Sequence, residues 1–154
     1  MTALPAPTSA RLIKGVIAIL VGCAINYFGD RLLGIKIELF YGIQTFNFLW
    51  ILDMFALPFV VGVVVAVIFG LGGKWLCYFP PLIVRAFSYY EILHGTVPHG
   101  MSLLPMGWWG FFVILVIEAS AFGGVMGEIW VKGTYGRSPR QMVYKESSGE
   151  ANEE

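Results

Sequence analysis

Charged side chains are scarce in this chain of 154 residues: 13% are Asp, Glu, Lys or Arg, whereas 57% are hydrophobic. A soluble domain usually carries about 25% charged residues and about 45–50% apolar ones. Together with a mean hydropathy of +0.73, the shortage of charge indicates an integral membrane protein rather than a soluble domain. The 10 basic and 10 acidic residues balance, so no basic patch for nucleic acid is expected.

Cysteine and histidine are also rare. Cys23 and Cys77 lie in different apolar segments without a Cys-x-x-Cys pair, which indicates neither a metal site nor a redox pair. His94 and His99 lie near Glu91 and are the candidates for a metal site, but their spacing matches no standard zinc motif. Without a Cys-x-x-Cys-His motif, a haem is not expected either. We predict no cofactor and assign no catalytic residue, because no nucleophile, base and orienting group come together.

Long apolar runs dominate what remains. A bilayer core about 30 Å thick needs about 20 mostly apolar residues in a helix. Four segments approach this length, over residues 12–29, 47–70, 75–93 and 108–131. The predicted fold is therefore an all-α polytopic membrane protein with four transmembrane helices. Pro80, Pro81 and Arg85 interrupt the third segment, which we predict to be a Pro-broken span, with an interfacial helix as the alternative.

The distribution of lysine and arginine predicts the orientation of these spans. Basic residues flank the first span at its start and follow the second and fourth spans, at Arg11, Lys14, Lys74 and Lys132. The linker after the third span has neither lysine nor arginine. Both termini are therefore expected in the cytoplasm, and the host bilayer is expected to be a plasma membrane such as the bacterial inner membrane.

The chain reads as one transmembrane domain over residues 11–132 with polar tails at 1–10 and 133–154. The linker over residues 30–46 is too apolar for a free loop. Its apolar residues fit one helical stripe, although part of it also alternates like a strand. We expect it to lie on the outer surface or against a partner protein. The apolar residues of the stripe are Leu32, Ile35, Leu39 and Ile43.

Three ionisable residues fall inside the predicted spans. Counted at 1.5 Å per residue from the outer ends, Asp53 lies about 9 Å deep and Arg85 about 12 Å deep. Glu118 lies about 15 Å down, near the midplane. An isolated charge at such a depth costs about 2.5–3.5 kcal/mol, so these side chains should pair or face water. We predict a buried ion pair between Asp53 and Arg85 that fixes helix register, with Glu118 as a second acceptor or a separate acid. The alternative is a proton or ion path through the three residues.

Small residues recur every four positions in two spans. Such faces let helix backbones approach closely, where packing replaces the hydrophobic effect. They are expected to pack within this chain or against other subunits. The residues concerned are Ala18 and Gly22 in the first span and Ala119, Gly123 and Gly127 in the fourth.

These features favour a non-enzymatic accessory subunit that scaffolds or stabilises a larger membrane complex, surrounded by lipid and other membrane subunits. The first alternative is a transporter or proton-conducting subunit that uses Asp53, Arg85 and Glu118. The second is a membrane enzyme of lipids or quinones that uses Glu91 and His94.

Overall fold

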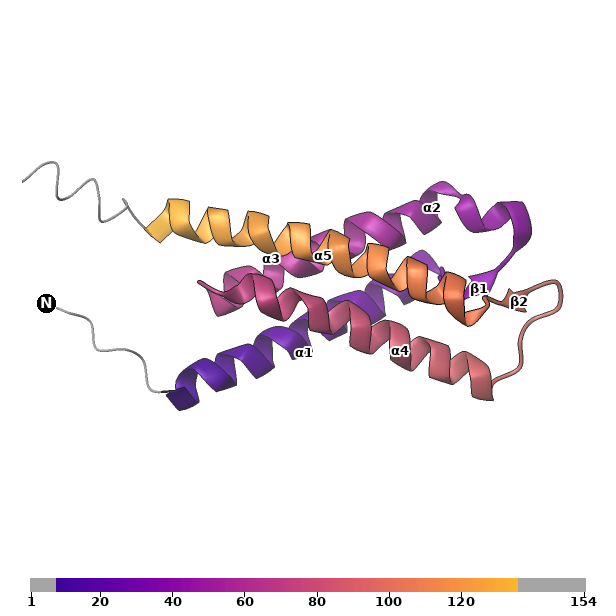
Figure 1. The fold of residues 1–154 in the computed structure, drawn as a ribbon, viewed down its shortest axis with the longest axis horizontal. Coiled ribbons are helices and arrows are strands. Elements are labelled where there is room, and N and C mark those ends of the chain that lie inside the picture. Colours follow the sequence, from indigo (N-terminus) through magenta and orange to yellow (C-terminus); the bar gives the residue numbers. More distant parts are fainter. Residues whose placement is uncertain (1–7, 136–154) are drawn as a thin grey trace, which may run out of the picture.

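The computed structural model describes residues 8–135, which form an elongated helical bundle (Figure 1). The predicted tails at 1–10 and 133–154 lie almost wholly outside this range. The elements in chain order are α1 (Thr8–Leu33), β1 (Leu39–Phe40), η1 (Gly42–Phe46), α2 (Phe48–Ile51), η2 (Leu52–Ala56), α3 (Leu57–Phe69), η3 (Gly73–Tyr78), α4 (Phe79–His94), β2 (Ser102–Leu103) and α5 (Met106–Tyr135).

The helices run along the long axis of the bundle and alternate in direction. The start of α1 and the end of α5 lie at the same end, on the left of Figure 1, where α3 also turns back into α4. We call this the turn end. Strands β1 and β2 pair at the opposite end, which we call the strand end.

Three helical segments are long and apolar enough to cross a membrane, which confirms a helical, membrane-integral protein. They cover Ser9–Leu33, Phe48–Phe69 and Met106–Gly133, and they correspond to the first, second and fourth predicted spans. The third predicted span differs, because α4 has 16 residues and is about 24 Å long at 1.5 Å per residue. It is preceded by the 3-10 helix η3, which lengthens the helical path toward the turn end.

The proline pair of the third predicted span begins a helix rather than breaking one. Pro80 and Pro81 lie in the first turn of α4, where backbone N–H groups have no partner within the helix in any case. The irregularity therefore lies at the junction of η3 and α4, ahead of the prolines.

The second predicted span is continuous from α2 through α3, with one widened turn. In the π-helix η2, the N–H of Leu57 donates to the carbonyl of Leu52, five residues back. Pro58 follows directly and has no N–H to donate, so its ring requires a local departure from the regular helix. Asp53 and Met54 are buried within this widened turn.

The linker over residues 30–46 folds back onto the strand end instead of forming one helical stripe. Leu39 and Phe40 pair antiparallel with Leu103 and Ser102. Leu39 is 2% exposed, whereas Leu32 and Ile43 are 87% and 95% exposed. The predicted single helical stripe is therefore wrong, because α1 ends at Leu33 and the chain then runs through a short strand, with residues 37–39 buried in succession.

Glycine allows the helices to touch closely toward the turn end. A Cβ at Gly123 of α5 would overlap the carbonyl oxygen of Phe59 in α3, and one at Gly62 would overlap that of Ser120. A Cβ at Gly127 would lie 2.8 Å from Val63 O, and one at Gly22 would lie 2.7 Å from Pro80 Cγ. These small-residue faces are used inside the chain, and the buried Ala18 and Ala119 accompany them.

Candidate charge cluster and cavity

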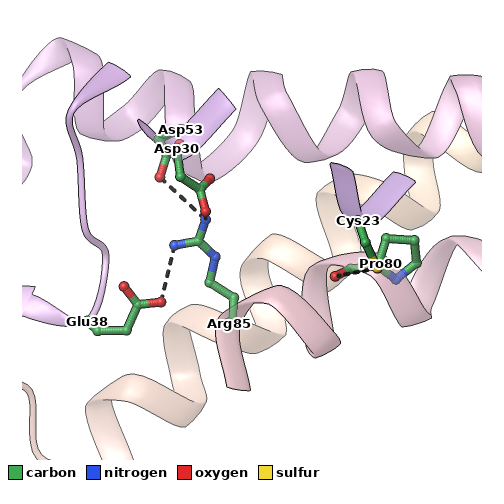
Figure 2. A network of polar contacts seen from close by, with 6 residues as sticks. All are labelled: Cys23, Asp30, Glu38, Asp53, Pro80 and Arg85. Carbon is green, nitrogen blue, oxygen red and sulfur yellow. Dashed lines mark hydrogen bonds and ion pairs between the residues drawn. The ribbon is translucent and has the colours of Figure 1, made fainter. Parts of the chain in front are cut away.

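Arg85 of α4 lies at the centre of a buried charge cluster near the strand end (Figure 2). Its Nη1 donates to Glu38 Oε1 at 3.2 Å. Its Nη2 forms an ion pair with Asp30 Oδ2 and lies 3.7 Å from Asp53 Oδ2. We name these four residues the Arg85 cluster. They come from α1, the linker before β1, η2 and α4, so one guanidinium joins four segments of the chain.

The cluster contains more carboxylates than cations. Three acids face a single guanidinium, and the side chains of Glu38 and Asp53 are 1% and 0% exposed. Four carboxylate oxygens lack a hydrogen-bond partner: Asp30 Oδ1, Glu38 Oε2 and both oxygens of Asp53. Buried carboxylates this close cannot all ionise without further positive charge. The Arg85 cluster therefore needs bound protons or another cation.

Glu38 lies outside the spans and shows the effect of burial directly. Burial raises the pKa of its carboxyl above the usual value, and the nearby Asp30 adds to this. Arg85 lowers the same pKa but does not cancel the effect of burial. Glu38 therefore holds a proton at a higher pH than an exposed glutamate does.

A cavity of about 500 Å³ opens beside the cluster. Its inner wall includes the buried Asp30, Glu38 and Arg85, and exposed side chains surround its mouth. The exposed residues at the mouth are Arg31, Lys36 and Glu91. Tyr27, Ser88 and Ile92 line the cavity wall along α1 and α4. The cavity therefore approaches the cluster from the strand end, where the Asp30 side chain is 10% exposed and that of Arg85 is 1% exposed.

The bundle on the other side of the cluster is tightly packed. Ala18, Val61, Val65, Ala66 and Cys77 are fully buried in one apolar group. The Cys77 thiol donates to the Gly62 carbonyl at 3.2 Å, and the Ser120 hydroxyl donates to the Cys77 carbonyl at 2.8 Å. Between the two regions, one turn before Asp30, lies the buried amide of Asn26, which has no hydrogen-bond partner among the described residues.

The structure brings together two of the three predicted intramembrane charges. Asp53 and Arg85 are in contact, as their similar depths predicted. Glu118 is not in the cluster, because its side chain is exposed on the outer face of α5. Whether the contact serves as a register-fixing pair or as part of a path stays a prediction.

Sequence reasoning missed Asp30 and Glu38 as partners of Arg85. Both were assigned to the linker, and no local pattern predicts that this linker folds back over the strand end. The only usable indication was two acids in an otherwise apolar segment.

The residues considered for a metal site lie apart from the cluster core. His94 Nδ1 lies 3.0 Å from the Tyr90 carbonyl, and its ring packs on Tyr90. Within residues 8–135, no group of three or more His, Cys, Asp or Glu side chains is arranged to hold a metal ion.

No protein family, curated protein or solved structure matches this chain. Any functional assignment therefore rests on the geometry described above.

Proposed function

We propose that this protein is a non-enzymatic, membrane-integral subunit that stabilises a larger membrane complex through the outer face of α5. The observation that carries the proposal is the exposed carboxyl of Glu118 near the middle of this membrane-length helix. An acid facing lipid at mid-depth costs about 2.5–3.5 kcal/mol. A partner helix with a basic or amide side chain at the same depth would remove that cost.

The surroundings of Glu118 favour a helix as the occupant. Large apolar side chains at helical spacing continue above and below it on the same face, all of them 45–68% exposed. The small residues of α5 lie on the opposite, buried face. The outer stripe consists of Phe111, Ile114, Phe122, Val125 and Ile129.

Mild extraction followed by native mass spectrometry tests this function. The wild-type protein should appear with another membrane chain in fixed stoichiometry, and a photocrosslinker at position 118 should join the two. Glu118→Leu should release the partner and leave the isolated chain at least as heat-stable as the wild type. Phe122→Leu is the control, because it keeps the stripe apolar and should retain the partner. A wild-type monomer that behaves like Glu118→Leu would refute the proposal.

The proposal includes four crossings, with η3 and α4 together forming the third, and both termini in the cytoplasm of a plasma membrane such as the bacterial inner membrane. Its support is that the start of α1, η3 and the end of α5 lie at the turn end (Figure 1) and carry Arg11, Lys14, Lys74 and Lys132. The positive-inside rule favours this end as the cytoplasmic side, although Arg31 and Lys36 lie toward the strand end. Single cysteines introduced at Thr96 and Ser147 should be labelled from opposite sides of the membrane. Labelling of both from one side would refute this topology.

A second candidate function, proton or ion conduction, is favoured by the cavity that leads to the Arg85 cluster. Asn26 extends this polar region by one turn toward the packed half. In sealed vesicles the wild-type chain would then dissipate a pH gradient, and Asp53→Asn would abolish the leak. Equal gradient decay in protein-free vesicles and wild-type vesicles would rule it out.

A further inference from the structure

Charged side chains line the cavity at the strand end both at its inner wall and at its mouth. Carboxylates lie at its inner wall, where Glu38 and Asp30 are buried. At its mouth two exposed cations, Arg31 and Lys36, lie with one exposed acid, Glu91. Every ion pair within residues 8–135 involves Arg85, so Arg31 and Lys36 have no acidic partner in the described part of the chain.

The inner wall presents unused acceptors. Glu38 Oε2 has no hydrogen-bond partner although its side chain is 1% exposed. In Figure 2 this oxygen points away from Arg85, which holds the other one. Asp30 Oδ1 is also without a partner. A buried carboxylate oxygen left without a donor is costly, and an ammonium group offers three donors and the missing positive charge.

The mouth is suited to an anionic group. The Arg31 guanidinium lies 4.4 Å from the centroid of the Tyr27 ring, which positions it beside the opening. Arginine and lysine together are the usual ligands of phosphate and carboxylate groups. A volume of about 500 Å³ lies within the usual range of small-molecule sites, about 300–1,000 Å³.

We propose that this cavity binds a small zwitterion, with its ammonium group at Glu38 and Asp30 and its phosphate or carboxylate group at Arg31 and Lys36. The same chemistry occurs in a free zwitterion such as phosphoethanolamine and in the headgroup of phosphatidylethanolamine. This site is separate from the Glu118 face, so it does not depend on the proposed function.

Thermal unfolding of the purified chain in detergent tests the site. The probes are phosphoethanolamine, ethanolamine and inorganic phosphate at neutral pH, and phosphatidylethanolamine against phosphatidylglycerol in mixed micelles. At least one zwitterionic probe should raise the unfolding temperature more than ethanolamine or phosphate does. A response to the soluble probe assigns a free ligand, and a response to the lipid alone assigns the headgroup.

Variants show whether the response comes from this cavity. Glu38→Gln should weaken binding about tenfold or more, since a charge-assisted hydrogen bond is lost. Arg31→Gln and Lys36→Gln change exposed residues and should fold normally. Each should weaken binding of the zwitterion but not that of ethanolamine, and they carry the test if Glu38→Gln does not fold. Glu118→Gln, the same isosteric change outside the cavity, should bind normally.

Two results would overturn the proposal. One is the absence of any stabilisation by phosphoethanolamine or phosphatidylethanolamine. The other is equal stabilisation by ethanolamine and the zwitterions that Arg31→Gln and Lys36→Gln leave unchanged, since the mouth would then have no role.

Discussion

The two halves of the bundle are held together by different physics. Toward the turn end, α3 and α5 meet backbone to backbone, and the Gly123 and Phe59 contact leaves no room for a side chain. Toward the strand end, α1, η2, α4 and the linker are spaced around Arg85 and its three acids. The turn-end half depends on glycines that carry no side chain, and the strand-end half depends on the ion pairs of Arg85.

The comparison separates the half in which helices associate by close packing from the half that holds the charged cavity. Apolar helices in lipid gain little from burying one another, so close packing of small residues supplies their association. Such packing brings the helix backbones into contact, and the cavity of about 580 Å³ beside this half is lined by apolar side chains of α3 and α5. The charged half holds a large guanidinium beside a cavity with a charged lining, so a polar ligand is expected at the strand end.

Of the changes considered, Arg85→Met should lower the stability of the protein most, and it acts in the charged half. It leaves Asp30, Glu38 and Asp53 buried without a counter-charge, and removing one member of a buried pair costs about 3–5 kcal/mol. Unfolding in detergent would measure the loss. Arg31→Met is the control, because Arg31 is exposed and its Tyr27 contact is worth about 0.5–1 kcal/mol.

A double variant tests whether Arg85 is shared by all three acids. Adding Asp53→Asn to Arg85→Met should recover only part of the lost stability, because Asp30 and Glu38 remain unneutralised. Full recovery would show that Asp53 alone pairs with Arg85, against the shared cluster.

Gly123→Ala should have the next largest effect, in the packed half. The new methyl meets a backbone carbonyl rather than a flexible side chain, so α3 and α5 must separate, at a cost of about 1–3 kcal/mol. The matched control is Gly110→Ala in the same helix, where a Cβ meets nothing within 4 Å. This control should be neutral or slightly stabilising; a loss equal to that of Gly123→Ala would refute the packing argument.

Glu128→Gln should cost less. Glu128 Oε1 accepts from the N–H groups of Gly72 at 2.8 Å and Lys74 at 3.1 Å, and so fixes the turn between α3 and η3. The amide keeps an acceptor but loses the charge, a difference of about 1 kcal/mol. Thermal unfolding beside Glu91→Gln, an exposed control, would detect it.

The smallest effect is a change of pH dependence in Glu38→Gln. Burial raises the pKa of Glu38 above 4.5 in the folded state, so folding favours its protonated form. Its contribution to stability is complete below pH 4.5 and is lost as pH rises through the raised pKa. Glu38→Gln should therefore lose less stability than the wild type between pH 4.5 and neutral pH. Parallel pH profiles would show that Glu38 ionises as an exposed acid does.

Much of the bundle could be predicted because apolar length and depth are local properties of the sequence. Apolar length predicted three membrane-length helices, and similar depth predicted that Asp53 lies near Arg85. Depth alone does not give the direction of a side chain, which is why Glu118 was grouped with them. Its spacing from Phe111, Phe122 and Val125, opposite the small residues of α5, was the available indication that it faces outward.

The rest depended on contacts between distant parts of the chain. Glu38 reaches Arg85 only because β1 pairs with β2, which follows it by more than sixty residues. No composition or period within residues 30–46 specifies that pairing. The π-turn at Leu52–Ala56 was likewise hidden, although Pro58 marked a departure from regular helix.

The order of charges along the chain has a consequence for biosynthesis. Asp30, Glu38 and Asp53 all precede Arg85, so a ribosome delivers three acids to the membrane before it makes their shared cation. Until α4 has been made, Asp30, Glu38 and Asp53 lack the guanidinium that joins them in the folded chain. The Arg85 cluster therefore cannot form until translation has passed residue 85.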